Sequence, residues 1–125
     1  MNDNHDKPLF INFSNHPISG WSEEQLKAAR HYGEVFDLPF PQVDPMATSQ
    51  EIQRLEEDCV CRILAAGAGH PFTVHVMGEL TLVYHVVTAL KQRGIPCVAS
   101  TTDRDSTEYD GLKLSEFNFV RFREY

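Results

Sequence analysis

The sequence predicts an α/β fold: a single open, Rossmann-like sheet, mostly parallel, with an antiparallel C-terminal edge strand and three main helices. Strand and helix signals alternate three times along residues 9–94, the order that gives parallel β-α-β units. The first strand segment, residues 9–13, is almost continuously apolar, as expected of a strand covered on both faces. Residues 117–125 instead alternate aromatic and polar side chains over most of their length, which is typical of a half-exposed antiparallel strand.

The elements of the first half have clear start and stop signals. Ser22 and Gln25 form a capping-box pattern that begins a helix, and Gly33 is the type of residue that ends one. Residues 34–38 follow as a second strand. Residues 39–45 contain three prolines, which remove backbone donors and fix extended geometry, so we expect a stiff surface loop there.

The middle of the chain repeats this pattern. Thr48 and Glu51 form a second capping box, and apolar residues at helical spacing continue that helix to residues 66–67. Residues 72–77 are the third expected strand, and an apolar stripe over residues 80–90 predicts the third helix.

The last quarter differs from the rest. Residues 95–100 are expected to form a fourth strand, with Pro96 near its start where it is best tolerated. Residues 101–111 are polar and charged, so we expect a loop, with a turn at Asp110-Gly111.

Length and charge limit the possible functions. The 125 residues suit one domain, and we expect a flexible N-terminus at residues 1–8 followed by a single domain over residues 9–125. Acidic residues outnumber basic ones 18 to 11, giving a net charge of -7, which disfavours binding to long nucleic acid. No apolar run is long enough to cross a membrane and no secretory signal is evident, so the expected location is cytoplasmic.

The candidate site lies in the loops after the strands. Open parallel sheets bind ligands beyond the carboxyl ends of their strands, where the strand order reverses. The loops after the first, third and fourth expected strands contain most of the candidate catalytic and ligand-binding residues: Ser14, Asn15 and His16; Gly78, Glu79 and Thr81; Thr101, Thr102 and Arg104. Two of these loops lead into helix N-termini, whose N–H groups attract phosphate without lysine or arginine.

The first loop combines a hydroxyl, an amide and an imidazole. His16 is the candidate general acid or base, because imidazole titrates near neutral pH. The alternative is that Ser14 and Asn15 cap the local backbone and that His16 is exposed without a functional role.

The second loop also has two interpretations. Gly78 either lets a ligand approach the backbone closely or is a turn glycine. Glu79 either contacts a ribose hydroxyl or acts as a base, or it caps the helix that follows. Thr81 is better placed to donate to phosphate.

The cations of the last third are Arg104, Arg121 and Arg123, and the last two share one face of the terminal strand. These arginines could bind phosphate, because guanidinium groups bind it in a bidentate manner. The equal alternative is that they are solvated charges on the strand, paired with nearby glutamates. The sequence has neither GxGxxG nor GxxxxGK[ST], and its histidines and cysteines lack zinc-site spacing. We therefore expect no cofactor and no metal.

Four segments of the chain resemble a known family. NFSNHP, VMGELT, STTDR and FVRFREY, spread over residues 9–125, resemble small stand-alone CRISPR-associated proteins at the periphery of the CARF superfamily. The Rossmann-like domains of that superfamily bind cyclic oligoadenylates, and several small members are ring nucleases. The chain lacks a lysine in either loop, unlike CARF members that place one on phosphate.

The resemblance implies a homodimer that binds cyclic oligoadenylate, with cyclic tetra-adenylate expected. It also implies cleavage without metal, in which a ribose 2′-hydroxyl attacks the adjacent phosphate. His16 would assist proton transfer, Ser14, Asn15, Gly78 and Thr81 would hold phosphates, and Arg104 would offset the developing charge.

Three other functions remain open at this point. The first is a sensor or sponge that holds the messenger without cutting it. The second is a nucleoside or nucleotide transferase on a flavodoxin-like scaffold, with Glu79 as nucleophile. The third is a structural subunit without a small-molecule site.

Overall fold

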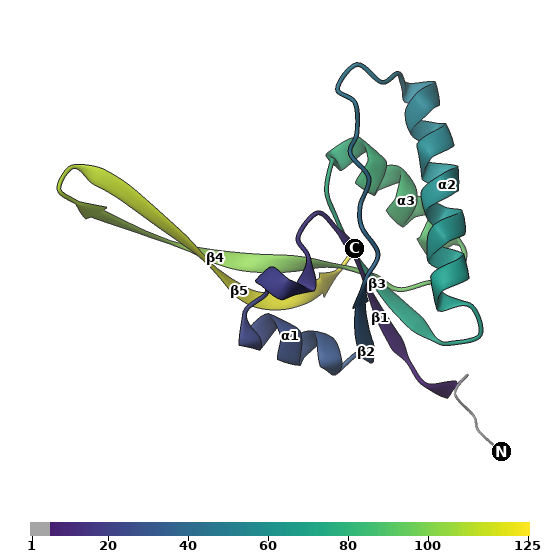
Figure 1. Ribbon diagram of the computed structural model, residues 1–125, viewed down its shortest axis with the longest axis horizontal. Coiled ribbons are helices and arrows are strands. Elements are labelled where there is room, and N and C mark those ends of the chain that lie inside the picture. The colour runs from purple at the N-terminus through teal and green to yellow at the C-terminus, as the bar shows by residue number, and fades with distance from the viewer. Residues whose placement is uncertain (1–5) are drawn as a thin grey trace.

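One five-stranded sheet forms the centre of the computed structural model, which describes residues 6–125 and, for residues 105–109 and 113–116, the backbone alone. The elements in chain order are β1 (Leu9–Ser14), the 3-10 turn η2 (Ile18–Gly20), α1 (Glu23–Arg30), β2 (Glu34–Asp37), α2 (Ser49–Gly67), β3 (Phe72–Met77), α3 (Leu80–Gln92), β4 (Cys97–Tyr109) and β5 (Leu112–Glu124). The strand order is β2-β1-β3-β4-β5 (Figure 1). Residues 1–5 of the expected flexible N-terminus lie outside the described residues.

The predicted fold class is confirmed. β2, β1, β3 and β4 are parallel neighbours, and β5 pairs with β4 antiparallel. α2 and α3 cover one face of the sheet around a core that includes Ile11, Ile63 and Leu82. On the other face, α1 packs over Phe10 and Phe122. β1 and β3, at the centre, are covered on both faces, which explains the apolar sequence of β1.

Both expected N-caps are present. The Ser22 hydroxyl accepts the N–H of Gln25, and the Thr48 hydroxyl accepts the N–H of Glu51. Each bond satisfies one of the amides that a helix start leaves without an intrahelical partner. Among the described residues, no helix is both long and apolar enough to cross a membrane.

The prediction of a loop over residues 101–111 is wrong, because most of this segment is strand. β4 begins at Cys97, later than expected, and continues to Tyr109; Asp110 and Gly111 then form the predicted turn, with φ of 50° and 75°. The ladder from Thr102–Phe119 to Tyr109–Leu112 is a two-stranded ribbon, here called the arm. The arm projects beyond the rest of the sheet (Figure 1), so its strands do not need an apolar face. Without the alternation of apolar and polar residues, their sequence does not indicate a strand.

Candidate ligand site at the carboxyl edge of the sheet

The carboxyl ends of β1 and β3 lie side by side, because these strands are hydrogen-bonded neighbours and Ser14 pairs with Met77. The strand order reverses at this point, since the chain passes from β1 outward to β2 and then returns to β3 on the other side. This is the position at which open α/β sheets bind ligands. The prediction that the loops after these two strands meet at one edge is therefore confirmed.

Asn12, near the end of β1, is the centre of a buried hydrogen-bond network. Its side chain is 1% exposed. Nδ2 donates to the His16 carbonyl at 2.9 Å and to Asp37 Oδ1 at 2.8 Å. Oδ1 accepts from the Ser14 hydroxyl at 2.7 Å and contacts His75 Nδ1 at 2.8 Å. These four contacts use the full bonding capacity of the amide, so Asn12 ties together β1, β2, β3 and the loop after β1.

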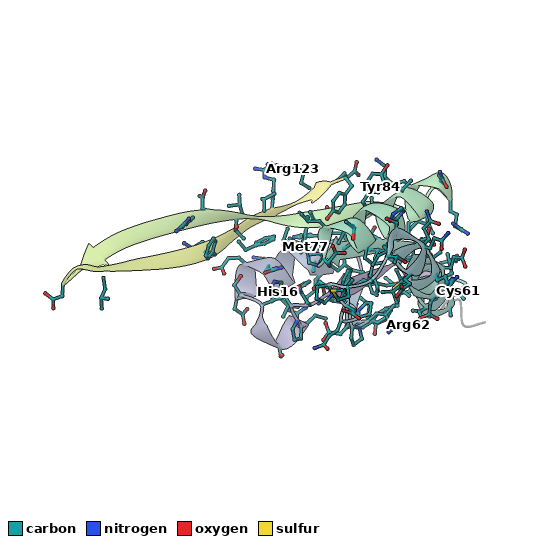
Figure 2. All side chains as sticks on the ribbon, turned by 90° about the horizontal axis from the view of Figure 1, so that it is seen from above. His16, Cys61, Arg62, Met77, Tyr84 and Arg123 are labelled. Atoms are coloured by element: carbon teal, nitrogen blue, oxygen red, sulfur yellow. The ribbon has the colours of Figure 1, made fainter. Side chains whose placement is uncertain are left out.

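This network holds Ser14 and the backbone of His16. Ser14 is buried, and its hydroxyl accepts the His16 N–H at 3.2 Å while donating to Asn12. The His16 carbonyl also accepts from Trp21 Nε1 at 3.1 Å. The backbone of His16 is thus held at both its N–H and its C=O, whereas its side chain is exposed (Figure 2). Ser14 therefore has a structural role in holding this loop, and the imidazole of His16 is exposed above it.

His75 is a neutral, buried member of the same network. Its ring lies 5.4 Å from that of Trp21 and 5.3 Å from that of Phe122, centroid to centroid. Burial, followed by the charge of His16, lowers the pKa of His75 to about 4. Because Asn12 Oδ1 is an acceptor, the network assigns the proton to Nδ1 and leaves Nε2 bare. No described residue bonds to that nitrogen. His75 therefore has the structural role that its apolar strand suggested.

The corner after β3 is closed by its own glutamate. One carboxylate oxygen of Glu79 accepts the N–H of Thr81 at 3.1 Å, and the other accepts the N–H of Leu82 at 2.9 Å. The Thr81 hydroxyl donates to both oxygens, at 2.8 and 2.6 Å. The bond from the Thr81 hydroxyl, followed by that from the Leu82 N–H, lowers the pKa of Glu79.

Glu79 is therefore the N-cap of α3, which was one of its two interpretations. The amides and the hydroxyl that were expected to receive a phosphate already bind a carboxylate. The same bonds stabilise the anionic form of Glu79 and make it a poor nucleophile, which disfavours the transferase alternative.

Gly78 accommodates a protein side chain. A Cβ at this position would lie 2.5 Å from Cε1 of Phe40. The space that the missing side chain leaves is thus filled by the Phe40 ring, which comes from the proline-rich segment after β2. The two expected phosphate-binding corners therefore differ. Glu79 and Phe40 close the one after β3, whereas the one after β1 keeps the side chains of Asn15 and His16 exposed. The N–H groups of His16 and Ile18 are nevertheless bonded within the protein, so the expected backbone site for phosphate is found at neither corner.

The residues expected in a loop after the fourth strand lie in β4 itself. Thr101 donates through its hydroxyl to the carbonyl of Arg121 at 3.1 Å. Thr102 lines a separate hollow between the arm and the start of α1. Arg104 lies over the ring of Phe117, 5.8 Å from its centroid. They are spread along a ribbon, and so the expected third ligand loop does not exist.

Arg121 and Arg123 are exposed on one face of β5. Phe122, between them, points to the opposite face and packs with Trp21 and Phe10. Figure 2 shows Arg123 and His16 on opposite sides of the sheet. The structure therefore does not bring these arginines to the loop that contains His16.

A hollow of about 330 Å³ lies beside the loop after β1 and is here called the carboxyl-edge hollow. Its lining residues come from that loop and from the segment after β2: Ser14, Asn15, Pro17, Asp37, Pro39, Phe40 and Gln42. Phe40 supplies an aromatic surface, and Asn15 and Gln42 supply amides that can both donate and accept. Arg62 of α2 approaches the rim, where Nη2 donates to the Pro39 carbonyl at 3.5 Å.

Sequence reasoning missed Phe40, Gln42, Asp37 and Arg62. The signal was available for the first three, because β2 is parallel to β1 and its carboxyl end must therefore lie at the same edge. The three prolines in this segment indicate a stiff loop but do not indicate which side chains that loop brings to the edge. Arg62 had no such signal, because its approach depends on how α2 packs against that loop.

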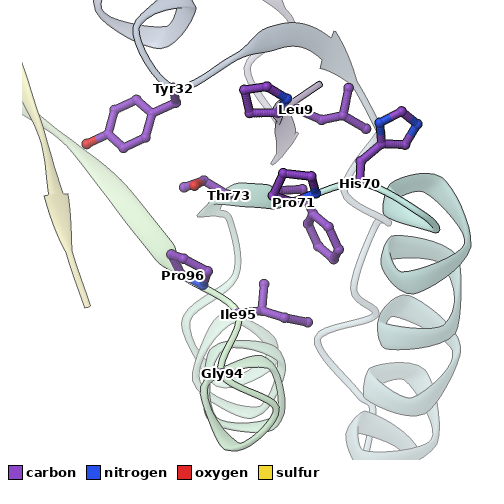
Figure 3. Close-up of a pocket in the computed structure, with 10 residues that line it drawn as sticks. Leu9, Tyr32, His70, Pro71, Thr73, Gly94, Ile95 and Pro96 are labelled. Atoms are coloured by element: carbon purple, nitrogen blue, oxygen red, sulfur yellow. The ribbon is translucent and has the colours of Figure 1, made fainter. Parts of the chain in front are cut away.

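Another hollow, of about 360 Å³, lies at the opposite, amino edge of the sheet (Figure 3). It is lined in part by Pro8, Pro71 and Pro96, which directly precede β1, β3 or β4. Proline has no N–H, so this edge offers few backbone donors to an anion. None of the predicted site residues lies here.

Among residues 6–125, with the side chains of 105–109 and 113–116 left aside, no three His, Cys, Asp or Glu side chains are close enough to hold a metal ion. A family model described as the Uncharacterized protein MJ1673 family matches residues 8–123 of the chain. No curated protein matches it.

Proposed function

The chain belongs to the Uncharacterized protein MJ1673 family, and we propose that it binds a cyclic oligoadenylate through an adenine base held in the carboxyl-edge hollow. The observation that carries this proposal is the composition of that hollow, which places an aromatic ring beside two primary amides at the edge where the strand order reverses. The choice of a cyclic oligoadenylate comes from the resemblance to the CARF superfamily. The hollow supports the base rather than the phosphates.

The lining residues divide the work of base recognition. Phe40 offers a surface on which a planar base can stack. The amides of Asn15 and Gln42 can pair with the donor and acceptor atoms of an adenine edge. Asp37 is engaged through Oδ1 by Asn12 and by the N–H of Ile18 at 3.1 Å, which leaves Oδ2 for the exocyclic amine of adenine. A volume of about 330 Å³ is sufficient for one nucleoside.

The experiment that tests this proposal compares two rings of equal charge by isothermal titration calorimetry. Cyclic tetra-adenylate should bind at least tenfold more tightly than cyclic tetra-uridylate, because only the base differs. Asn15→Ala and Gln42→Ala should each lower the affinity for cyclic tetra-adenylate by roughly tenfold, about 1.4 kcal/mol of binding free energy. Gln53→Ala, which removes an exposed amide on α2, should leave the affinity unchanged. Equal affinity for the two rings would overturn base recognition.

A second candidate function is cleavage of the bound ring, favoured by the exposed imidazole of His16 on a fixed backbone. In this reaction, neutral His16 takes the proton of a ribose 2′-hydroxyl while the 2′-oxygen attacks the adjacent phosphorus. The bond from phosphorus to the 5′-oxygen breaks, the leaving 5′-oxygen takes up a proton from water, and a 2′,3′-cyclic phosphate remains; His16 then returns its proton to the solvent.

Cleavage is tested by incubating labelled cyclic tetra-adenylate with the protein in EDTA. We expect a linear product, and we expect His16→Gln to slow its formation by at least 100-fold without a matching loss of affinity. Binding without any product from the wild-type protein would reject cleavage. The protein would then be the sensor or sponge, because the base-binding site does not depend on His16.

A further inference from the structure

A hollow of about 400 Å³ lies between the root of the arm and the start of α1 and is here called the arm-root hollow. It is lined in part by Ser22, Glu24 and Gln25 from the start of α1 and by Thr102, Phe117 and Phe119 from the arm. Figure 1 shows α1 beside the base of β4 and β5. The described residues that line it are not those that line the carboxyl-edge hollow. Its volume is in the range of pockets that bind small molecules, so the groups along its walls indicate which ligand it suits.

One wall of the arm-root hollow is aromatic. Phe117 and Phe119 lie two residues apart in β5, so their side chains point to the same face of the strand. The ring of Phe119 is fixed by the core, since its centroid lies 4.9 Å from that of Phe122. Phe117, by contrast, is 65% exposed. A flat apolar group that stacked on Phe117 would remove this ring from water.

The other wall carries polar groups that are available for hydrogen bonding. Within the described part of the chain, the carboxylate of Glu24 and the side-chain amide of Gln25 make no hydrogen bond or ion pair. The Ser22 hydroxyl accepts the N–H of Gln25 and retains its own proton to donate. A carboxylate accepts hydrogen bonds from two neighbouring hydroxyls at once, and it is the group that dinucleotide sites place on the ribose. This wall therefore suits a ribose with free 2′- and 3′-hydroxyls.

The charges around the hollow favour an uncharged ligand. Glu24 is the only charged residue among the described lining residues, and its carboxylate repels a phosphate. Arg104 lies over the ring of Phe117, 5.8 Å from its centroid, and its guanidinium repels a cation from that ring. An ammonium ligand is disfavoured for this reason, although aromatic rings beside a carboxylate otherwise suit one.

We infer that the arm-root hollow binds an uncharged nucleoside. The base stacks on Phe117 beside Phe119, and Glu24 accepts hydrogen bonds from the 2′- and 3′-hydroxyls of the ribose. The ligand joins the arm to α1, which are otherwise separated by the hollow. This inference does not depend on the proposed function, because it uses a different hollow and a ligand without phosphate.

The first test is a titration of the labelled protein with uridine, followed by amide chemical shifts. Uridine is the probe because stacking on an aromatic ring tolerates any base, whereas the carboxyl-edge hollow is proposed to prefer adenine. We expect saturable changes at Gln25, Thr102 and Phe119, with a dissociation constant of about 1 mM or lower. No saturable change at these residues would overturn the inference. Changes confined to Asn15 and Gln42 would overturn it too, because the nucleoside would then lie in the carboxyl-edge hollow.

Two analogues test the role of Glu24 in the same titration. We expect 2′-deoxyuridine and uridine 5′-monophosphate to bind roughly fivefold more weakly than uridine, or worse. The first lacks a hydroxyl for the carboxylate, and the second brings a charge that the carboxylate repels. Equal affinity of uridine and 2′-deoxyuridine would overturn the inference.

The second test uses pairs of exposed side chains, whose replacement leaves the core intact. Phe117→Ala should weaken uridine binding by roughly tenfold, whereas Leu112→Ala, at the 67% exposed tip of the arm, should not. Glu24→Ala should weaken uridine binding by roughly fivefold and remove the preference over 2′-deoxyuridine. Glu23→Ala, which removes the neighbouring carboxylate of the same first turn, should do neither. Equal losses within either pair would overturn the inference.

Discussion

The corners after β1 and after β3 end neighbouring strands at the same edge of the sheet, yet one is open and the other is closed. After β1, the buried side chain of Asn12 holds the loop by donating to the His16 carbonyl, and the side chains of Asn15 and His16 are exposed. After β3, Glu79 folds back onto the N–H groups of its own helix and Phe40 fills the space over Gly78. Equal topological position does not make two equal sites, because local side chains decide which groups remain exposed to a ligand.

The largest expected effect follows from removing the side chain that keeps the first corner open. Asn12→Ala leaves the buried side chains of Ser14 and His75 without their shared partner, and each unsatisfied buried group costs about 1–3 kcal/mol. We expect the free energy of unfolding to fall by about 3–5 kcal/mol in urea denaturation. A loss below about 1 kcal/mol would mean that the loop after β1 holds its conformation without Asn12.

The next largest effect is the pH dependence of stability that comes from His75, the buried partner of Asn12. Its pKa of about 4 in the folded protein lies below the ordinary value of 6.5, so between these values the unfolded chain binds more protons. Acidification through this window should lower the free energy of unfolding by about 3 kcal/mol, at 1.36 kcal/mol for each pKa unit. The contribution of neutral, buried His75 to stability is complete above about pH 6.5 and is lost as the pH falls towards 4.

The comparison that isolates this effect is wild type against His75→Gln. Carboxylates also titrate in this range, so the difference between the two pH profiles of stability is the quantity to measure. The variant should show a shallower decline with acid. Parallel profiles would show that His75 does not titrate as a buried group.

A smaller effect is expected at the closed corner. Gly78→Ala places a Cβ 2.5 Å from the Phe40 ring, and the ring must move to admit it. We expect a loss of about 1–3 kcal/mol in the free energy of unfolding. Phe40→Leu in the same chain should reduce the loss, since a double-mutant cycle reports the contact between the two residues. Additive losses would contradict the packing of Phe40 over Gly78.

The smallest effect comes from opening the closed corner. Glu79→Ala removes the cap of α3 and should cost about 1 kcal/mol near neutral pH, measured by thermal unfolding. Inorganic phosphate should recover part of this loss in the variant and none in the wild type, since the freed N–H groups attract an anion. If phosphate stabilises both proteins equally, then Glu79 is not what closes this corner.

Much of the fold was predictable because its signals are local. The caps at Ser22 and Thr48 and the apolar run of β1 depend on neighbours in sequence. The boundaries of β4 were not predictable in the same way. Residues 101–109 are strand because β5 pairs with them, and an exposed ribbon does not require the alternation by which strands are recognised.

The candidate site was predicted only in part, for a related reason. The meeting of the loops after β1 and β3 follows from parallel topology. Whether Glu79 caps its own helix or leaves the amides available depends on one side-chain rotamer. That Phe40 reaches Gly78 depends on the path of the loop after β2. The role of Asn12 was hidden because a polar residue inside an apolar strand carries no spacing signal.

The most direct measurement of the central claim is the map of amide chemical-shift changes when cyclic tetra-adenylate is added to the labelled protein. The account predicts the largest changes at Asn15, His16, Phe40 and Gln42, which belong to the open corner and its hollow. Changes centred on Thr81 and Leu82, or no changes at this edge, would contradict it.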